Sequence, residues 1–308
     1  MLKTDVLPFT PLTAKELPLV FPYLTGKFAG ICDMSLLYFH MWGGLLHTEY
    51  AFAEEVLFLR RNTRHGTFYY PPLVLGEDRD FKRGFSKLSL LGQEGAITLG
   101  AMPETALETL KGLYTLHDIA TSRTYADYLY APEDLATLAG KRYSKKRNLV
   151  HQFEKLYPEA TYESMNEENA AEAAELLRTI MKNTEMDANE IFENKRVLEV
   201  LADYRQLPLL GGLVRVAGVP VAFAVGEVVD GTLYVHIEKA DRAYKGAYQY
   251  INRAFVRSVM QGQEITLVNR EDDSGDEGLR QAKLSYFPVG LGYKYRATVQ
   301  SLSEGATV

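Results

Sequence analysis

The segment TLYVHIEKADRAYKGAYQYINRAF, residues 232–255, changes its hydrophobic period at its centre and decides the fold. Tyr234, His236 and Glu238 alternate with apolar neighbours, a pattern that predicts a β-strand with these three side chains on one face. After the loop, apolar residues recur at helical spacing, which predicts a helix over 247–261. A strand that leads through a short loop into a helix is typical of an α/β fold.

The residues before this segment predict a run of antiparallel strands. Asp230-Gly231 separates two apolar stretches, and a type I′ hairpin turn needs positive φ at both central residues, which this pair tolerates. We expect strands over 210–216, 219–228 and 232–239. Two helices, over 167–183 and 189–206, precede them, and Asn166 is the expected N-cap of the first.

The same order of elements occurs twice in the 308 residues. In the second half, a strand over 161–164 opens the order, and a strand over 264–269, a helix over 277–286 and a strand over 293–299 complete it. The first half repeats it with strands near 6–10, 48–53, 56–61, 67–70, 96–101 and 117–130 and helices near 14–24, 33–42, 78–91 and 104–114. We therefore expect an α/β fold with α+β mixed sheets, in two tandem domains, 1–140 and 141–308, joined by a helical stretch over 132–156.

Composition excludes several classes of protein. The chain is 46% hydrophobic and 24% charged, as soluble globular proteins are, and its net charge of −6 leaves room only for a local basic patch that binds nucleic acid. Cys32 is the single cysteine, which excludes an internal disulfide and a Cys-based zinc site and favours a reduced, cytoplasmic setting. We expect no metal site. Residues 209–229 form the most apolar window, but charges, proline and glycine interrupt it, so we expect no transmembrane segment.

Three stretches carry a resemblance to a known family: SLLYFHMWGG (35–44), HIEKADRAYKGAYQYINRAF (236–255) and NREDDSGDEGLRQAKLSYFP (269–288). The chain resembles the C-terminal domain of phosphatidylglycerol lysyltransferase, the DUF2156 family, and Fem-type transferases of the acyl-CoA N-acyltransferase (GNAT) superfamily. The resemblance spans almost the whole sequence and implies two GNAT-like domains. It also implies a transferase that moves an aminoacyl group from aminoacyl-tRNA, or an acyl group from acyl-CoA, onto an amine or hydroxyl. The lysyltransferases carry a transmembrane bundle ahead of this domain, which this sequence lacks, so the acceptor is expected to be either a small molecule or lipid-like.

The resemblance also implies a donor-binding loop. In GNAT enzymes, backbone N–H groups between the fourth strand and the next helix bind the donor pyrophosphate. The corresponding donor-binding residues are Ile237, Lys239, Arg242, Lys245, Gly246, Ala247, Tyr248 and Asn269. Ala243 stands where the family has Arg or Gln, and Tyr248 where it has Gly or Ala, which weakens the case for coenzyme A. The equivalent junction of the first domain contains Pro71-Pro72 and several acids, so we expect the donor site only in the second.

The resemblance further implies catalytic residues. Tyr286 ends the last predicted helix, where many GNAT enzymes place a tyrosine that protonates the leaving group. His236 or Glu238 would take a proton from the acceptor. A structural role is an equally open interpretation of each, because the chain has 20 tyrosines and a single His or Glu on a strand usually serves the fold.

A basic run, KRYSKKR over 141–147, lies near the middle of the chain. Lys141, Arg142 and Arg147 are the expected substrate-binding residues, because clustered Lys and Arg bind the phosphates of tRNA or another anionic substrate. A solvated start of a helix explains the run as well.

An acidic run, EDDSGDE over 271–277, precedes the last helix. It is not an EF-hand, because counting from Asp272 the sixth residue is Glu277 and the twelfth is Lys283. Ser274 and Glu277 have the form of a capping box, so we expect most of the run to be structural. The expected buried stripe of the helix is Leu279, Ala282 and Tyr286.

Two functions therefore stand side by side. The first is the transferase, with no tightly bound cofactor and with acyl-CoA or aminoacyl-tRNA as the donor co-substrate. The second is a catalytically inactive GNAT-fold protein that binds a CoA- or nucleotide-like ligand, and the departures at Ala243 and Tyr248 favour it.

Overall fold

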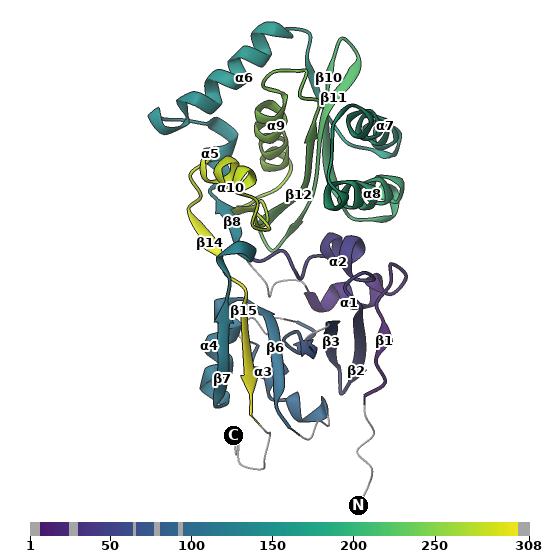
Figure 1. Cartoon of the computed structure of the whole chain (residues 1–308), viewed down its shortest axis with the longest axis vertical. Coiled ribbons are helices and arrows are strands. Elements are labelled where there is room, and N and C mark those ends of the chain that lie inside the picture. Colours follow the sequence, from purple (N-terminus) through teal and green to yellow (C-terminus); the bar gives the residue numbers. More distant parts are fainter. Residues whose placement is uncertain (1–6, 25–29, 64–65, 77–80, 92–94, 301–308) are drawn as a thin grey trace, which may run out of the picture. The chain divides into compact units, whose positions relative to one another are not determined.

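The chain forms two mixed sheets, and the order of elements that the sequence predicts occurs twice along it (Figure 1). The computed structural model describes residues 7–24, 30–63, 66–76, 81–91 and 95–300. Two compact units result. The first contains Met1–Asp127, Asp272–Gly275 and Leu291–Val308, and the second contains Tyr128–Glu271 and Asp276–Gly290.

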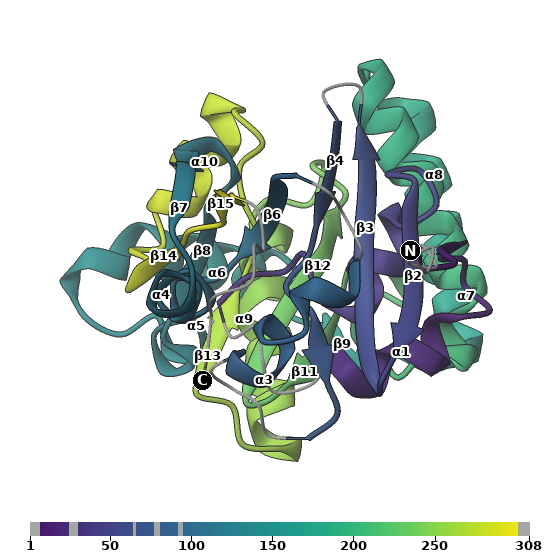
Figure 2. The same cartoon turned by 90° about the horizontal axis from the view of Figure 1, so that it is seen from below.

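The sheet of the first unit has the strand order β1-β2-β3-β4-β6-β15-β7, with β5 paired to β3 (Figure 2). β4 runs parallel to β6, and the other pairs are antiparallel. The strands are β1 (Thr10–Pro11), β2 (Thr48–Ala53), β3 (Val56–Thr63), β4 (Gly66–Tyr69), β5 (Leu73–Val74), β6 (Ile97–Met102), β7 (Leu116–Thr121) and β15 (Tyr295–Val299).

Four α-helices of the first unit lie within the described residues: α1 (Leu17–Leu24), α2 (Leu36–Trp42), α3 (Lys82–Phe85) and α4 (Glu104–Leu113). Short 3-10 turns cover Leu88–Leu91 and Arg123–Tyr125. The helix expected over 78–91 is therefore only one α-turn followed by a 3-10 turn within its described part, and 78–80 lie outside the described residues. Of the strand expected near 6–10, residue 6 also lies outside them. Phe58, Phe85 and Leu99 are among the fully buried side chains of this unit's core.

The sheet of the second unit has the order β14-β8-β13-β12-β11-β10-β9. Its strands are β8 (Asp127–Tyr130), β9 (Thr161–Ser164), β10 (Leu210–Val216), β11 (Val219–Val229), β12 (Thr232–Ala240), β13 (Leu267–Asn269) and β14 (Gly290–Gly292). Its helices are α5 (Pro132–Thr137), α6 (Ser144–Leu156), α7 (Glu167–Asn183), α8 (Ala188–Ala202), α9 (Ala247–Gly262) and α10 (Glu277–Leu284), with 3-10 turns at Lys141–Tyr143 and Tyr204–Gln206. α7 and α8 cover one face of this sheet, and α9 covers the other, with α6 packed on α9 (Figure 1).

Local signals in the second unit are confirmed. Asp230 and Gly231 have φ of 49° and 72°, as a type I′ turn requires, and β11 pairs with β12 across them. The Asn166 side chain accepts the N–H of Asn169 and caps α7 in a reciprocal capping box.

The last strand of each repeat differs from the expected division at residues 140 and 141. β15, from the end of the chain, lies between β6 and β7 in the first sheet, and β8, which precedes residue 140, pairs with β13 in the second. Because strand pairing is made by backbone hydrogen bonds that any sequence offers, the hydrophobic pattern of a strand does not specify which sheet it joins.

Candidate functional site

The candidate site of the second unit lies where β12 and β13 separate. The two strands pair in parallel only from Thr232 to Tyr234, and β13 ends at Asn269 while β12 continues to Ala240. The side chains of β12 beyond Tyr234 therefore contact residues that follow β13. The Tyr234 and His236 rings stack at 6.1 Å between their centres.

The pairing of β12 with β11 shifts register between Val235 and Ile237, and this β-bulge at His236 breaks the alternation that the sequence predicts. The expected common face is therefore wrong for Glu238: Tyr234 pairs with Asn269, whereas Glu238 lies on the opposite face and contacts Arg270, the next residue.

Glu238 is the centre of a buried polar cluster. Asn252 Nδ2 of α9 donates to Glu238 Oε2 at 2.9 Å, and Arg270 Nη2 donates to Glu238 Oε1 at 3.2 Å. The Glu238 and Arg270 side chains are only 14% and 13% exposed. Arg270 Nη1 and Asn252 Oδ1 are buried without a hydrogen-bond partner in the part of the chain that the structure describes. Since an unpaired buried polar group is costly, this donor and this acceptor point to a ligand that satisfies them.

Aromatic rings and a lysine enclose the Arg270 guanidinium. It lies 4.8 Å from the Tyr286 ring centre and 5.7 Å from that of Tyr130, and Lys146 Nζ of α6 lies 4.2 Å from the Tyr286 ring centre. Burial raises the pKa of Tyr286 and of Tyr130, against the opposing effect of Arg270, so both phenols stay protonated at neutral pH. Burial, helped by Arg270, lowers the pKa of Lys146, and Glu238 opposes that shift.

Tyr286 is held in place through its backbone. Tyr143 Oη donates to the Tyr286 carbonyl at 3.1 Å, and Lys283 Nζ donates to the Arg270 carbonyl at 2.6 Å. Neither bond uses the Tyr286 hydroxyl. Glu238 and Tyr286, two of the predicted catalytic residues, thus both contact the Arg270 guanidinium. A carboxylate, a cation and a phenol can therefore act on one reacting group.

His236 is fixed between two carboxylates. Its Nε2 lies 3.0 Å from Glu227 Oε1 and its Nδ1 lies 2.6 Å from Glu271 Oε1, and the His236 side chain is 1% exposed. Burial would lower the pKa of His236, but the hydrogen bonds to Glu227 and Glu271 outweigh it and raise the pKa to about 10. The ring is therefore an imidazolium at neutral pH with both nitrogens engaged, which makes it a positioning residue rather than an available base.

The predicted donor-binding residues divide between the two faces of β12. Ile237 is 1% exposed, and Lys239 Nζ pairs with Glu193 of α8 at 2.8 Å, so Lys239 lies on the face opposite Glu238. Asn269 is fully buried, and its Oδ1 accepts the N–H of Glu271 at 2.7 Å. It thereby holds the turn after β13, where Glu271 has a φ of 57°.

The predicted phosphate loop bonds to itself. The N–H groups of Asp241, Ala243, Tyr244 and Ala247 are bonded to acceptors of the protein. Gly246 has a φ of 89°, and a Cβ there would lie 2.3 Å from the Leu149 carbonyl oxygen of α6. This glycine is therefore required by the close approach of α6. Arg242 and Lys245 are exposed, and Tyr248 is half-buried.

The basic run separates into residues with different tasks. Arg142 pairs with Asp134 at 2.7 Å, and Arg147 Nη1 donates to the Gly140 carbonyl at 3.1 Å and to that of Leu138. Lys141 is exposed. Lys146, which the sequence did not single out, is the member of the run that reaches the Glu238 cluster.

The acidic run is structural, with a different cap from the one expected. Asp276, not Ser274, caps α10 by accepting the Leu279 N–H, because the helix begins at Glu277. The Ser274 N–H and hydroxyl donate instead to Asp272, each at 2.9 Å. Leu279 is 42% exposed and so lies outside the buried stripe, whereas Tyr286 is buried.

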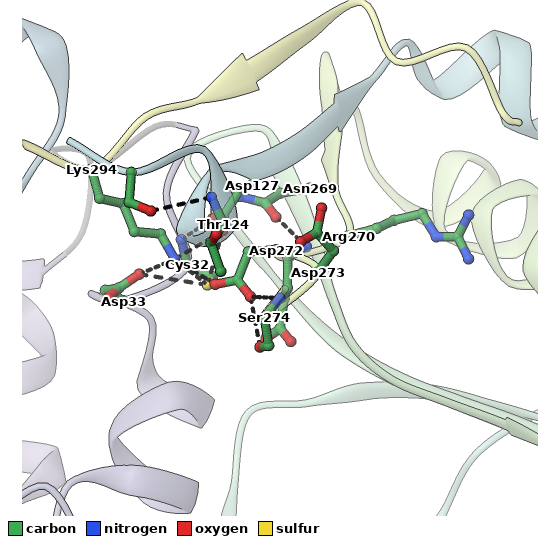
Figure 3. Close-up of polar contacts among 12 residues, drawn as sticks. Cys32, Asp33, Thr124, Asp127, Asn269, Arg270, Asp272, Asp273, Ser274 and Lys294 are labelled. Carbon is green, nitrogen blue, oxygen red and sulfur yellow. Dashed lines mark hydrogen bonds and ion pairs between the residues drawn. The ribbon is translucent and has the colours of Figure 1, made fainter. Parts of the chain in front are cut away.

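Asp272 belongs to a second ionic cluster, which lies within the first unit (Figure 3). Lys294 Nζ lies 2.5 Å from Asp33, 2.9 Å from Asp127 and 3.2 Å from Asp272, and Cys32 Sγ is 3.6 Å away. Burial would lower the pKa of Lys294, but Asp33 and its neighbours hold it well above its usual value.

Cys32, Asp33 and Asp127 are close enough together to hold a metal ion. The Lys294 ammonium contacts all three and supplies the positive charge that they need. Residues as far apart as 32 and 294 form no spacing motif, so no pattern in the sequence indicates this cluster. For the Glu238 cluster the missed residues are Tyr130, Lys146, Asn252 and Arg270, and two of them, Asn252 and Arg270, lie within the stretches that carry the family resemblance.

Within the described ranges, no helix is both long and apolar enough to cross a bilayer. Residues 29–298 match the family model described as phosphatidylglycerol lysyltransferase, C-terminal. The chain is 29% identical to a conserved protein of unknown function from Bacteroides thetaiotaomicron, with a TM-score of 0.82 over 96% of this chain and 100% of that one.

Two further similarities are more distant. The structure of L-PGS from Bacillus licheniformis has a TM-score of 0.60 at 12% identity, over 96% of this chain and 94% of that one, which is a likeness of fold. An uncharacterised protein of Mycoplasmoides gallisepticum is 26% identical over 209 residues, 66% of this chain and 65% of its own length, so the chain spans just under two thirds of that relative.

Proposed function

Since this chain belongs to the family of phosphatidylglycerol lysyltransferase C-terminal domains, we propose that it is an aminoacyltransferase that moves an aminoacyl group from aminoacyl-tRNA onto an amine or hydroxyl acceptor. The observation that carries the proposal is the buried cluster of Glu238, Arg270 and Tyr286, with an unpartnered Arg270 Nη1 at its centre. Enzymes keep such unsatisfied donors where charge develops in a transition state.

Two features favour aminoacyl-tRNA over acyl-CoA as the donor. Four N–H groups of the loop before α9 already bond to the protein, and Leu149 of α6 fills the side of Gly246 where a Cβ would lie. A ribose alkoxide is a much stronger base than a thiolate, whose thiol has a pKa of about 8.5, so its departure depends more on a proton donor. A neutral Tyr286 therefore matches the ribose oxygen.

The residues act in the following order. The acceptor amine or hydroxyl attacks the ester carbonyl, and Glu238 takes its proton. Arg270 Nη1 donates to the oxyanion that forms on the carbonyl oxygen. The carbon–oxygen bond to the ribose then breaks, and Tyr286 gives its proton to the leaving oxygen. The proton that Glu238 took from the acceptor then passes to the Tyr286 phenolate, and both side chains return to their starting states. Lys146 adds positive charge beside the oxyanion. His236 holds Glu271, the residue next to Arg270, and so helps to position Arg270.

The test is a transfer assay with radiolabelled aminoacyl-tRNA. Acceptors are offered in two groups, a panel of small amines and vesicles that contain phosphatidylglycerol. We expect the radiolabelled aminoacyl group to appear on acceptors of one of these two groups. We expect Tyr286→Phe to lower kcat about 100-fold, because the general acid is lost. Tyr125→Phe, at a tyrosine that is 57% exposed in the first unit, is the matched control and should keep full activity.

Acyl-CoA is tested in parallel by following release of free thiol. Transfer from acyl-CoA alone would contradict the choice of donor. Failure of both donors with every acceptor, together with a melting temperature raised by a CoA- or nucleotide-like ligand, would favour the catalytically inactive binding protein.

A further inference from the structure

A groove lies between α5 and α9 of the second unit, apart from the Glu238 cluster. Its volume is about 390 Å³, and its polar lining is Glu133, Thr137, Arg253, Arg257 and Gln261. Arg257 is exposed, and within the described part of the chain no ion pair or hydrogen bond engages its guanidinium. Arg253 pairs with Glu154 of α6, but its Nε is buried without a partner among the described residues. The groove thus offers the exposed guanidinium of Arg257, and beside it Arg253 has one buried donor without a partner in the ranges that the structure describes.

The two faces of this unit carry opposite charge. Residues 141–156 contain six Lys or Arg and one Glu, α9 contains two Arg and no acid, and α5, the other wall of the groove, contains Glu133 and Asp134. This face is therefore basic, although the whole chain has a net charge of −6. α7 and α8, on the other face of the sheet, together contain seven Glu against four Lys or Arg. A basic face on an acidic protein concentrates a polyanion at one surface.

From this groove and this charge distribution we propose that the groove between α5 and α9, with the basic residues of 141–156 on the same face, binds the phosphodiester backbone of RNA, with Arg257 and Arg253 as phosphate ligands. The proposal rests on the proposed function and gives the donor a docking surface. Arginine forks bind phosphate oxygens with two parallel hydrogen bonds, and Gln261 and Thr137 can bond to ribose hydroxyls. Asn252 and Arg253 are neighbours on α9, so one helix serves both the groove and the Glu238 cluster.

An anionic membrane is the rival occupant of a basic surface. A membrane-binding face buries large apolar side chains in the lipid boundary. Among the described residues, the exposed large apolar side chains do not line this groove, whose apolar lining is Ala136 and Met260. A recessed, hydrogen-bonding groove therefore favours RNA.

The experiment measures the affinity of the whole protein for fluorescently labelled, uncharged tRNA as a function of salt. Arg257→Glu should lower the association constant about tenfold at about 0.1 M salt and reduce the salt slope by about 1, because one phosphate contact is lost. Lys195→Glu, an exposed charge reversal on α8, is the matched control and should change neither. Sedimentation with phosphatidylglycerol vesicles is measured on the same variants.

The proposal is overturned if Arg257→Glu and Lys195→Glu affect tRNA binding equally, or if Arg257→Glu weakens only the binding of vesicles. Uncharged tRNA keeps this test separate from catalysis. Binding of tRNA that depends on Arg257, without any aminoacyl transfer, would contradict the proposed function and leave the docking surface supported. If Arg257→Glu left the rate of transfer from aminoacyl-tRNA unchanged, the docking surface would be contradicted and the proposed function would remain supported.

Discussion

His236 makes the stability of the second unit depend on pH. Its pKa of about 10 in the folded protein lies above the ordinary value of 6.5, because Glu227 and Glu271 hold the charged ring. A pKa that folding raises contributes stability that is complete below pH 6.5 and is lost as pH rises toward 10. The family resemblance implies His236 or Glu238 as the base, and in the structure the His236 ring instead joins Glu227 to Glu271 as a structural clamp.

We expect His236→Gln to lower the melting temperature strongly at pH 6 and progressively less at pH 8 and 10, because the wild type loses the clamp over that range. Thermal melts at the three pH values measure the difference. His117→Gln, at an exposed histidine of β7, should give a constant small difference. If the melting temperatures of wild type and His236→Gln differed by the same amount at all three pH values, the structural role of His236 would be contradicted.

Lys294 is the corresponding residue of the first unit, and it shows how charge is balanced in a buried cluster. Three carboxylates surround one ammonium. The ammonium has three N–H donors, and Cys32 Sγ, at 3.6 Å, is a fourth acceptor beside it. These ion pairs hold the segment before β15 against the residues around Cys32. They also give Asp272, one acid of the 271–277 run, a structural role.

At the scale of elements, Gly246 marks the contact between α6 and α9. The sequence assigns this glycine to phosphate binding, whereas a Cβ there would meet the Leu149 carbonyl. The packing around it is aromatic, with Phe153 of α6 and Tyr250 of α9 at 4.6 Å between ring centres. This contact sets the position of α6 and therefore of Lys146.

Gly246→Ala should destabilise the protein by about 1–3 kcal/mol more than Gly218→Ala, because only the first adds overpacking to the cost of positive φ. Gly218 has a φ of 82° and nothing within 4 Å of a Cβ, which makes it the matched control. Urea unfolding measures both. Equal losses would mean that α6 yields to the added methyl group, and the glycine would then be free to serve a ligand.

At the scale of the whole molecule, the chain returns to its first unit at its end. β15 lies between β6 and β7, and its Ala297 and Val299 are buried in that unit's core. The first unit is therefore complete only when the last strand has been added, which makes its contacts long-range in sequence.

We expect Ala297→Asn to open the first unit, because it buries an amide in the core, whereas Arg296→Asn, at the exposed neighbouring position, should be tolerated. Cys32, the only cysteine, is 3% exposed and lies in that unit, so the rate of its reaction with a thiol reagent reports the opening. Slow thiol reaction in both variants would show that β15 is dispensable for the first unit.

The sequence by itself determined the elements and their local ends. The turn at Asp230-Gly231 and the cap at Asn166 follow from rules that act within a few residues. The expected common face of Tyr234, His236 and Glu238 does not, because a β-bulge at His236 interrupts the alternation. The same rules misplaced the cap of α10. Ser274 and Asp276 both suit an N-cap, and Asp276 is the cap because the helix begins at Glu277.

Tertiary structure decided what no local rule reaches. It placed β15 in the first sheet, joined Lys146, Asn252 and Arg270 around Glu238, and closed His236 between Glu227 and Glu271. Backbone hydrogen bonds are the same for every sequence, and ion pairs join residues that are distant along the chain. Strand partners and buried charges are therefore selected by the packed molecule as a whole.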